Sequence, residues 1–141
     1  MKFGLILAGA ALSALMIPAA LAETMTYKAD LKGSEEVPAT TSNGSGAATV
    51  TFDPATSVLT WKVTYSGLTG PATMGHIHGP AAPGKNAPVA IPFAKVDSPI
   101  EGSAKLTDQQ IADLKAGQLY VNIHTAANKA GEIRGQVTAA K

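Results

Sequence analysis

Val58-Leu59-Thr60-Trp61-Lys62-Val63-Thr64-Tyr65 is the stretch of sequence that decides the fold, because apolar and polar residues alternate along it from Leu59 onward. Successive side chains of a β-strand point to opposite faces of the sheet. The face expected to pack against a second layer carries Leu59, Trp61, Val63 and Tyr65. The face expected to meet water carries Thr60, Lys62 and Thr64. The pattern predicts a half-buried strand in a two-layered protein.

Seven further segments on either side of residues 58–65 have a similar composition and are separated by turn residues. They are residues 24–32, 47–53, 72–78, 89–95, 100–106, 119–125 and 132–138. Short strands at such regular spacing are typical of an antiparallel architecture. We therefore predict an all-β fold, an antiparallel Greek-key β-sandwich of about eight strands. Pro92 inside one segment indicates an edge strand or a bulge, because proline cannot donate to a neighbouring strand.

One segment has the signals of a helix, near residues 107–116. Thr107 is placed to cap it, and Gln110 occupies the third position of a capping box. Ile111 and Leu114 form a narrow apolar stripe, and Gly117 suits a left-handed residue after the last turn. A helix this short needs to dock on the sheet to be stable.

The first 22 residues have the pattern of a secretory signal peptide. Lys2 precedes an apolar stretch, residues 3–17, and Ala20-Leu21-Ala22 forms a cleavage site of small residues. A single N-terminal anchor helix is the alternative. We expect a signal peptide at 1–22 and one domain at 23–141, in a periplasmic or secreted protein that is not inserted in the membrane after cleavage.

Composition excludes several classes of function. The chain has no cysteine, which excludes thiolate catalysis, a thiol redox couple and cysteine-based metal or iron–sulfur sites. Without Lys2, ten basic and ten acidic side chains remain, and no segment collects the lysines into a stripe. A nucleic-acid partner would require such a stripe, so no nucleic-acid partner is expected.

The three histidines of the chain are the best clue to function. His76 and His78 are two residues apart in a predicted strand and would share one face, and a strand carrying His124 could bring a third imidazole beside them. Three imidazoles without a thiolate suit copper, our expected ion, or zinc as the alternative. Met74 lies two residues before His76, so its thioether is a candidate extra ligand, although core packing is its simpler interpretation. The loop at residues 79–88 is expected to form a rim of this site.

Four polar residues are candidates to support the ligands through hydrogen bonds rather than to bind the ion directly. They are Asn122, Glu132, Arg134 and Glu36. A carboxylate that accepts from a ligand imidazole fixes the tautomer of that imidazole. The alternative for Glu132 and Arg134 is a cross-strand ion pair, which contributes little to stability when exposed.

Four motifs in order resemble the CHRD domain, the domain named after the secreted developmental protein chordin. They are Glu36-Val37-Pro38, His76-Ile77-His78-Gly79, Gly117 with Tyr120-Val121-Asn122-Ile123-His124-Thr125, and Gly131-Glu132-Ile133-Arg134-Gly135-Gln136. The resemblance covers nearly all of residues 23–141 and implies a secreted β-rich domain without a defined activity. The His-x-His strand with a later histidine is also similar to the copper site of copper/zinc superoxide dismutases. The bridging histidine and the zinc half of that site are missing here.

Three functions are compatible with this sequence. The first is an exported copper-binding module for sequestration, delivery or sensing. The second is a non-catalytic structural or interaction domain that binds an extracytoplasmic protein or polysaccharide partner. The third is a minimal copper oxidoreductase of the superoxide-dismutase type. Serine-hydrolase and phosphate-binding motifs are absent from the sequence, so an enzyme is the less favoured reading.

Overall fold

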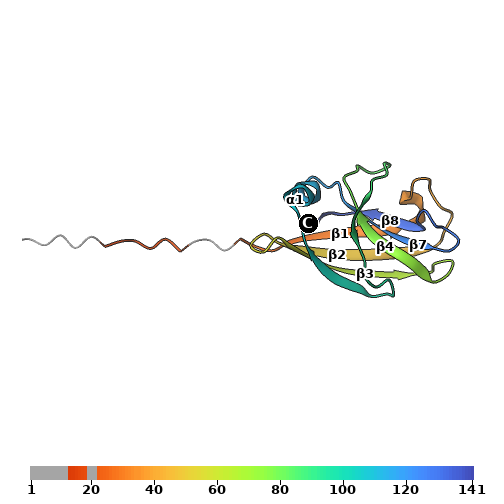
Figure 1. Cartoon of the computed structure of the whole chain (residues 1–141), viewed down its shortest axis with the longest axis horizontal. Coiled ribbons are helices and arrows are strands. Elements are labelled where there is room, and N and C mark those ends of the chain that lie inside the picture. The colour runs from red at the N-terminus through yellow and green to blue at the C-terminus, as the bar shows by residue number, and fades with distance from the viewer. Residues whose placement is uncertain (1–12, 19–21) are drawn as a thin grey trace, which may run out of the picture.

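The computed structural model describes residues 13–18 and 22–141. The predicted signal peptide, residues 1–22, lies mostly outside this part of the chain. The described domain is built from strands joined by short connections, with one helix (Figure 1). The strands are β1 (Met25–Lys32), β2 (Ser45–Asp53), β3 (Val58–Ser66), β4 (Ala72–His78), β5 (Val89–Pro92), β6 (Ile100–Lys105), β7 (Tyr120–Thr125), β8 (Ile133–Gln136) and β9 (Thr138–Ala139).

The strands form one sheet in which every pair is antiparallel. Their order is β5-β4-β7-β8-β1-β2-β3-β6, and the short β9 pairs with β1. The sheet curls into a near-closed, sandwich-like barrel, in which β1, β2 and β3 form one layer and β4, β7 and β8 the other (Figure 1). The predicted antiparallel all-β class is confirmed.

The core lies between these two layers. Leu59, Trp61 and Val63 are buried and the polar residues between them are exposed, as the alternation predicts. The ring of Trp61 lies 5.3 Å from the ring of Phe93, which follows β5 in the opposite layer. Ile77 in β4 is also fully buried. Inward residues of β4 therefore belong to the core, and the residues between them face outward.

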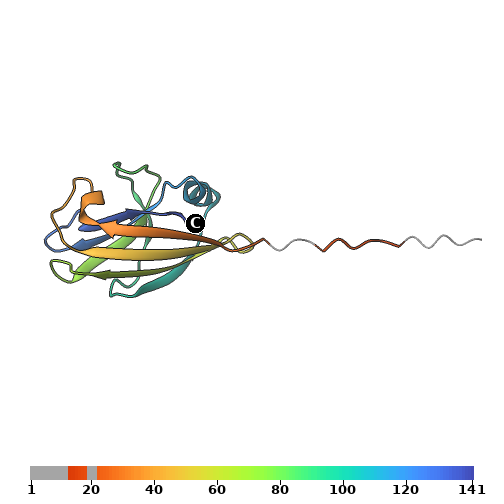
Figure 2. The ribbon, with the colours of Figure 1, turned by 180° about the vertical axis from the view of Figure 1, so that it is seen from behind.

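The helix and the edge strand follow the sequence signals. Helix α1 (Asp108–Lys115) has Thr107 as its N-cap in a complete capping box with Gln110, and Gly117 has a φ of +70°. Figure 2 shows α1 at one end of the sheet, with the C-terminus close to it. Strand β5 lies at the sheet edge and ends at Pro92, which confirms the position expected for that proline.

Three segments differ from the sequence prediction by more than a one-residue shift of an end. Strand β2 begins at Ser45, before the predicted start at residue 47. Strand β5 ends at Pro92 rather than at residue 95. The last predicted strand divides into β8 and β9. Its pairing with β7 ends at Gln136, and its pairing with β1 through β9 begins at Thr138. A short 3-10 turn, η1 (Gly33–Glu35), precedes the loop that carries Glu36.

Candidate metal centre

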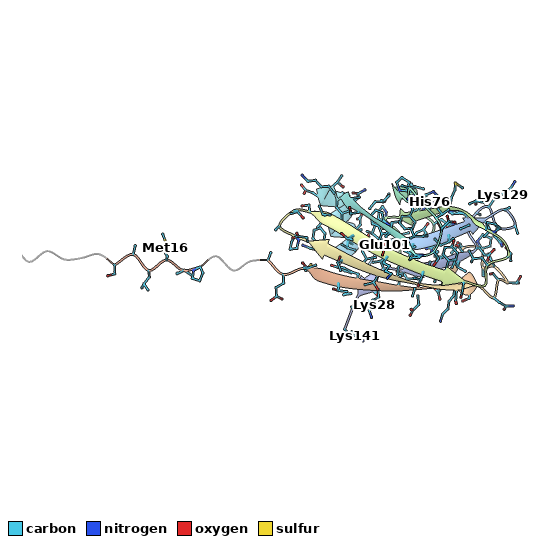
Figure 3. All side chains as sticks on the ribbon, turned by 90° about the horizontal axis from the view of Figure 1, so that it is seen from below. Met16, Lys28, His76, Glu101, Lys129 and Lys141 are labelled. Atoms are coloured by element: carbon cyan, nitrogen blue, oxygen red, sulfur yellow. The ribbon has the colours of Figure 1, made fainter. Side chains whose placement is uncertain are left out.

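The outward faces of β4 and β7 carry the three histidines. Buried Gly75 and Ile77 alternate with the more exposed Met74, His76 and His78 along β4. The register pairs Met74 with His124, His76 with Asn122 and His78 with Tyr120. Residues directly opposite on antiparallel strands share a face, so one pair of strands gathers all of these side chains. In Figure 3, His76 lies on this half of the molecule, whereas Lys28 and Glu101 lie on the other layer.

The three imidazoles are close enough to share one ion. His76 Nδ1 lies 3.2 Å from His124 Nε2. One ring nitrogen of each histidine lies within 4.8 Å of the corresponding nitrogens of the other two. The rings of His76 and His78 meet edge to face at a centroid distance of 5.2 Å. The predicted strand geometry thus brings His76, His78 and His124 together.

Backbone carbonyls fix the tautomers of two of these rings. His124 Nδ1 lies 2.7 Å from the carbonyl oxygen of Lys129, and His78 Nδ1 lies 2.9 Å from that of Ala87. A carbonyl only accepts, so both Nδ1 atoms carry hydrogen. In the neutral rings the lone pair is then on Nε2. His124 Nε2 then accepts from His76 Nδ1, so an ion would replace that hydrogen, and His78 Nε2 directs its lone pair toward Asn122 Oδ1.

The surroundings of His76 and His78 favour the neutral form of both rings. Burial lowers the pKa of His76, and the nearby His124 and His78 lower it further. Burial also lowers the pKa of His78, and the charge of Arg134 acts in the same direction. Only the neutral ring binds metal. Protons therefore compete for these nitrogens less than they would in free histidine.

Asn122 and Glu36 extend the centre inward. Asn122 is 3% exposed and its Oδ1 lies 3.0 Å from His78 Nε2, while its Nδ2 donates to Glu36 Oε1 at 3.2 Å. Burial raises the pKa of Glu36 to about 7, although the hydrogen bond from Asn122 and the charge of Arg134 oppose this shift. A Cβ at Gly131, where φ is +125°, would fall on both side chains. The lack of a side chain at this position makes room for the Asn122–Glu36 contact.

Arg134 supports the centre by stacking. Its guanidinium lies 3.5 Å from the centroid of Tyr120, and the ring of His78 stacks on the ring of Tyr120 at 4.9 Å. Sequence reasoning missed Tyr120, although its place two residues before Asn122 on the same strand indicated a shared face. Arg134 also donates to Asn86 and to the carbonyl of Lys85. These contacts hold the loop at residues 79–88 beside the histidines.

Met74 lies at the rim of the centre rather than within it. Its side chain is 47% exposed, and it faces the same side of β4 as His76 and His78. The strand is not disrupted at Gly75, because the pairing with β7 is continuous from Met74 to His78. The thioether is thus available at the surface beside His124.

Glu132 occupies a different environment from the one expected. Among the residues that the structure describes, no imidazole donates to its carboxylate; the donors are Ser42, Thr69, Thr125 and Asn128. Burial alone would raise the pKa of Glu132, but the hydrogen bonds from Thr69, Thr125 and Ser42 prevail and hold it at about 2. Glu132 therefore ties loops together and does not orient a ligand histidine.

Hollows also lie outside the histidine cluster, and two of those on the described residues exceed 400 Å³. The larger, of about 670 Å³, is on the outer face of the other layer and is lined by Thr49, Thr51, Thr60, Trp61, Lys62, Glu101, Gly102 and Ser103. The smaller, of about 430 Å³, is next to Glu36 and is bounded by residues 36–41 and 127–131. Neither is lined by a histidine, so the imidazole cluster is the site with recognisable chemistry.

Comparison with known proteins gives one match. The family model of the CHRD domain matches residues 27–137. No curated protein and no solved structure matches the chain significantly. Among residues 13–18 and 22–141, no helix is long and apolar enough to cross a membrane. The family match spans β1 to Val137 and includes every residue of the histidine centre, and the chain therefore belongs to the CHRD domain family.

Proposed function

We propose that this protein is an exported metal-binding module in which His76, His78 and His124 bind one copper ion, with zinc as the alternative. The observation that supports this most directly is the convergence of three ring nitrogens within 4.8 Å on one face of the sheet. Hydrogen bonds to backbone carbonyls already orient two of the three rings and place the lone pair of each on Nε2. CHRD domains occur in extracellular proteins, which agrees with the signal peptide expected at residues 1–22.

The spacing of the nitrogens fits a metal ion. Two ligand nitrogens about 2.05 Å from one ion and at a tetrahedral angle are about 3.4 Å apart. The separation of 3.2 Å between His76 Nδ1 and His124 Nε2 is close to that value. Nitrogens as far as 4.8 Å apart would have to close by about 1.4 Å, a movement available to side-chain rotation. The donor set suits copper or zinc, since both accept imidazole ligands readily.

The task we propose is sequestration, delivery or sensing of the ion outside the cytoplasm. His76 and His78 are only partly buried, whereas His124 is buried. The centre therefore combines an anchored inner ligand with two outer ligands that an entering ion can reach. Exchange of the ion with the surroundings requires such an accessible side, which a fully enclosed structural site lacks.

Isothermal titration of residues 23–141 with Cu(I), Cu(II) and Zn(II) tests this function. We expect one ion per chain, and we expect His78→Ala to lower the affinity at least about tenfold. Lys62→Ala is the matched control, because Lys62 is exposed on the other layer. Affinity no tighter than that of free histidine, or affinity unchanged by His78→Ala, would refute the proposal. Urea unfolding of each variant separates loss of the ligand from loss of the fold.

A further inference from the structure

We infer that Asn122 is a fourth ligand of this centre through Oδ1, that Glu36 is the residue that orients it, and that the centre is a three-nitrogen, one-oxygen site for a divalent ion. The inference rests on the proposed function and specifies it further. It concerns Asn122 and Glu36 in roles that go beyond hydrogen-bonding support. It also predicts which oxidation state of copper the protein prefers.

The first step is the contact between Asn122 and His78. Because His78 Nδ1 donates to the carbonyl of Ala87, the neutral ring has a lone pair on Nε2, and that atom faces Asn122 Oδ1 at 3.0 Å. Both atoms are then acceptors. Two acceptors at hydrogen-bond distance repel each other unless a cation lies between them. A metal ion bound by both atoms satisfies this pair.

The second step is the orientation of the amide. Glu36 Oε1 accepts from Asn122 Nδ2 at 3.2 Å. Because Oε1 accepts from Nδ2, the amide turns its nitrogen toward Glu36 and its oxygen toward the histidines. Gly131 leaves the room for this contact, since a Cβ there would fall on both partners. Glu36, which is 86 residues from Asn122 in sequence, and Gly131 thus hold the amide oxygen in one direction.

The third step is the position of that oxygen among the ligands. Asn122 pairs with His76 across β4 and β7, and it lies two residues from His124 along β7. Its side chain therefore lies on the face that carries the three imidazoles, and it is 3% exposed. Met74, the other candidate for a fourth ligand, is 47% exposed at the rim. The buried oxygen is better placed than the exposed sulfur.

The fourth step is the choice of ion. A carbonyl oxygen is a hard ligand, whereas a thioether is soft and favours Cu(I). A centre completed by Asn122 should prefer Zn(II) or Cu(II) over Cu(I). A centre completed by Met74 should prefer Cu(I). Substitutions at these two positions therefore have opposite consequences.

The test measures the affinities of residues 23–141 for Zn(II), Cu(II) and Cu(I) in the wild type, Asn122→Leu, Asn122→Asp and Met74→Leu. We expect Asn122→Leu to weaken Zn(II) and Cu(II) about tenfold or more, with a smaller effect on Cu(I). Asn122→Asp, made together with Glu36→Gln so that an amide still donates to it, keeps an oxygen ligand and should retain or strengthen divalent binding. Met74→Leu should leave the divalent affinities unchanged. Met25→Leu is the control for Met74, because Met25 is also exposed but lies on β1.

Glu36→Gln tests the orienting role separately. A glutamine amide can donate as well as accept, so it no longer dictates which end of Asn122 faces the histidines. We expect divalent affinity to fall several-fold and the Cu(II) electron paramagnetic resonance spectrum to broaden, because two amide orientations would then coexist. An unchanged spectrum and an unchanged affinity would contradict the role of Glu36. They would leave the prediction for His78→Ala, and with it the proposed function, as it stands.

Two results separate the failure of this inference from the failure of the proposed function. If the wild type binds no ion, the proposed function fails and this inference fails with it. If the wild type binds and His78→Ala weakens binding, but folded Asn122→Leu binds divalent ions as the wild type does, only this inference is overturned. Should Asn122→Leu not fold, weakened divalent binding by the folded double variant Asn122→Asp with Glu36→Gln, relative to Glu36→Gln alone, would overturn the inference in its place.

Discussion

Glu132→Gln tests the hydrogen-bonded cluster that closes one end of the sheet. The loops that contain Ser42, Thr69 and Asn128 meet at this end (Figure 1), and each of these residues donates to the carboxylate of Glu132. Thr69 donates through both its hydroxyl and its backbone N–H. Glu132 is 0% exposed, so water cannot replace a lost partner. The substitution keeps the shape of the side chain but turns one acceptor into a donor.

The magnitude follows from the pKa of Glu132. Hydrogen bonding holds it at about 2, against 4.5 for an ordinary glutamate. A difference of about 2.5 pKa units corresponds to about 3 kcal/mol of stabilisation by the ionised form. Because the folded-state pKa is the lower one, this stabilisation is fully present above about pH 4.5 and is lost as the pH falls toward 2. Glu132→Gln should therefore lower the free energy of unfolding by about 3 kcal/mol at pH 7 and by much less near pH 2.

Urea unfolding of residues 23–141 at pH 7, 4.5 and 2.5, followed by tryptophan fluorescence, measures this effect. Glu101→Gln is the matched control, because Glu101 is exposed on β6, and it should change stability by less than about 0.5 kcal/mol. The reasoning is refuted if wild type and Glu132→Gln lose stability in parallel as the pH falls. Parallel loss would mean that Glu132 is not the group whose protonation weakens the fold.

Three further predictions concern the surroundings of the histidines. Burial raises the pKa of Glu36 to about 7, so the free energy of unfolding of the wild type should fall as the pH rises from 4.5 through 7. Glu36→Gln carries no ionisable group there, and urea unfolding should show it becoming more stable than the wild type between pH 5 and pH 8. Gly131→Ala places a Cβ against Asn122 and Glu36 at a φ of +125°, and it should lower the free energy of unfolding by about 1–3 kcal/mol in the same measurement. Gly84→Ala is the control, because Gly84 has open space around it, and it should lower the free energy of unfolding by less. The pKa values of His76 and His78 are lowered, so Zn(II) affinity should persist to lower pH than for ligands with an ordinary histidine pKa of about 6.5. Zn(II) titrations from pH 7.5 to 5 measure this. A midpoint above pH 6.5 for the loss of affinity would contradict the prediction.

The sequence by itself determined the type and order of the elements. Alternation at residues 58–65 predicted which residues are buried in β3, and a local signal, the Thr107–Gln110 capping box, predicted α1. It also predicted that His76 and His78 share a face, because that depends only on the two-residue period of one strand. The sequence also predicted the position of Pro92 at a sheet edge, because a proline has no backbone N–H to donate to a neighbouring strand.

The tertiary structure alone decided which residues meet. Strand register places His124 beside His76, but it also places Glu132 among Ser42, Thr69 and Asn128, which lie in loops remote in sequence. No local pattern encodes such contacts, because they depend on how the sheet curls and where its loops converge. The same holds for Glu36, which contacts Asn122 although the two are 86 residues apart in sequence. The contact has room because Gly131 has no side chain. Periodicity fixes the direction of a side chain, and only the packed fold supplies its partner.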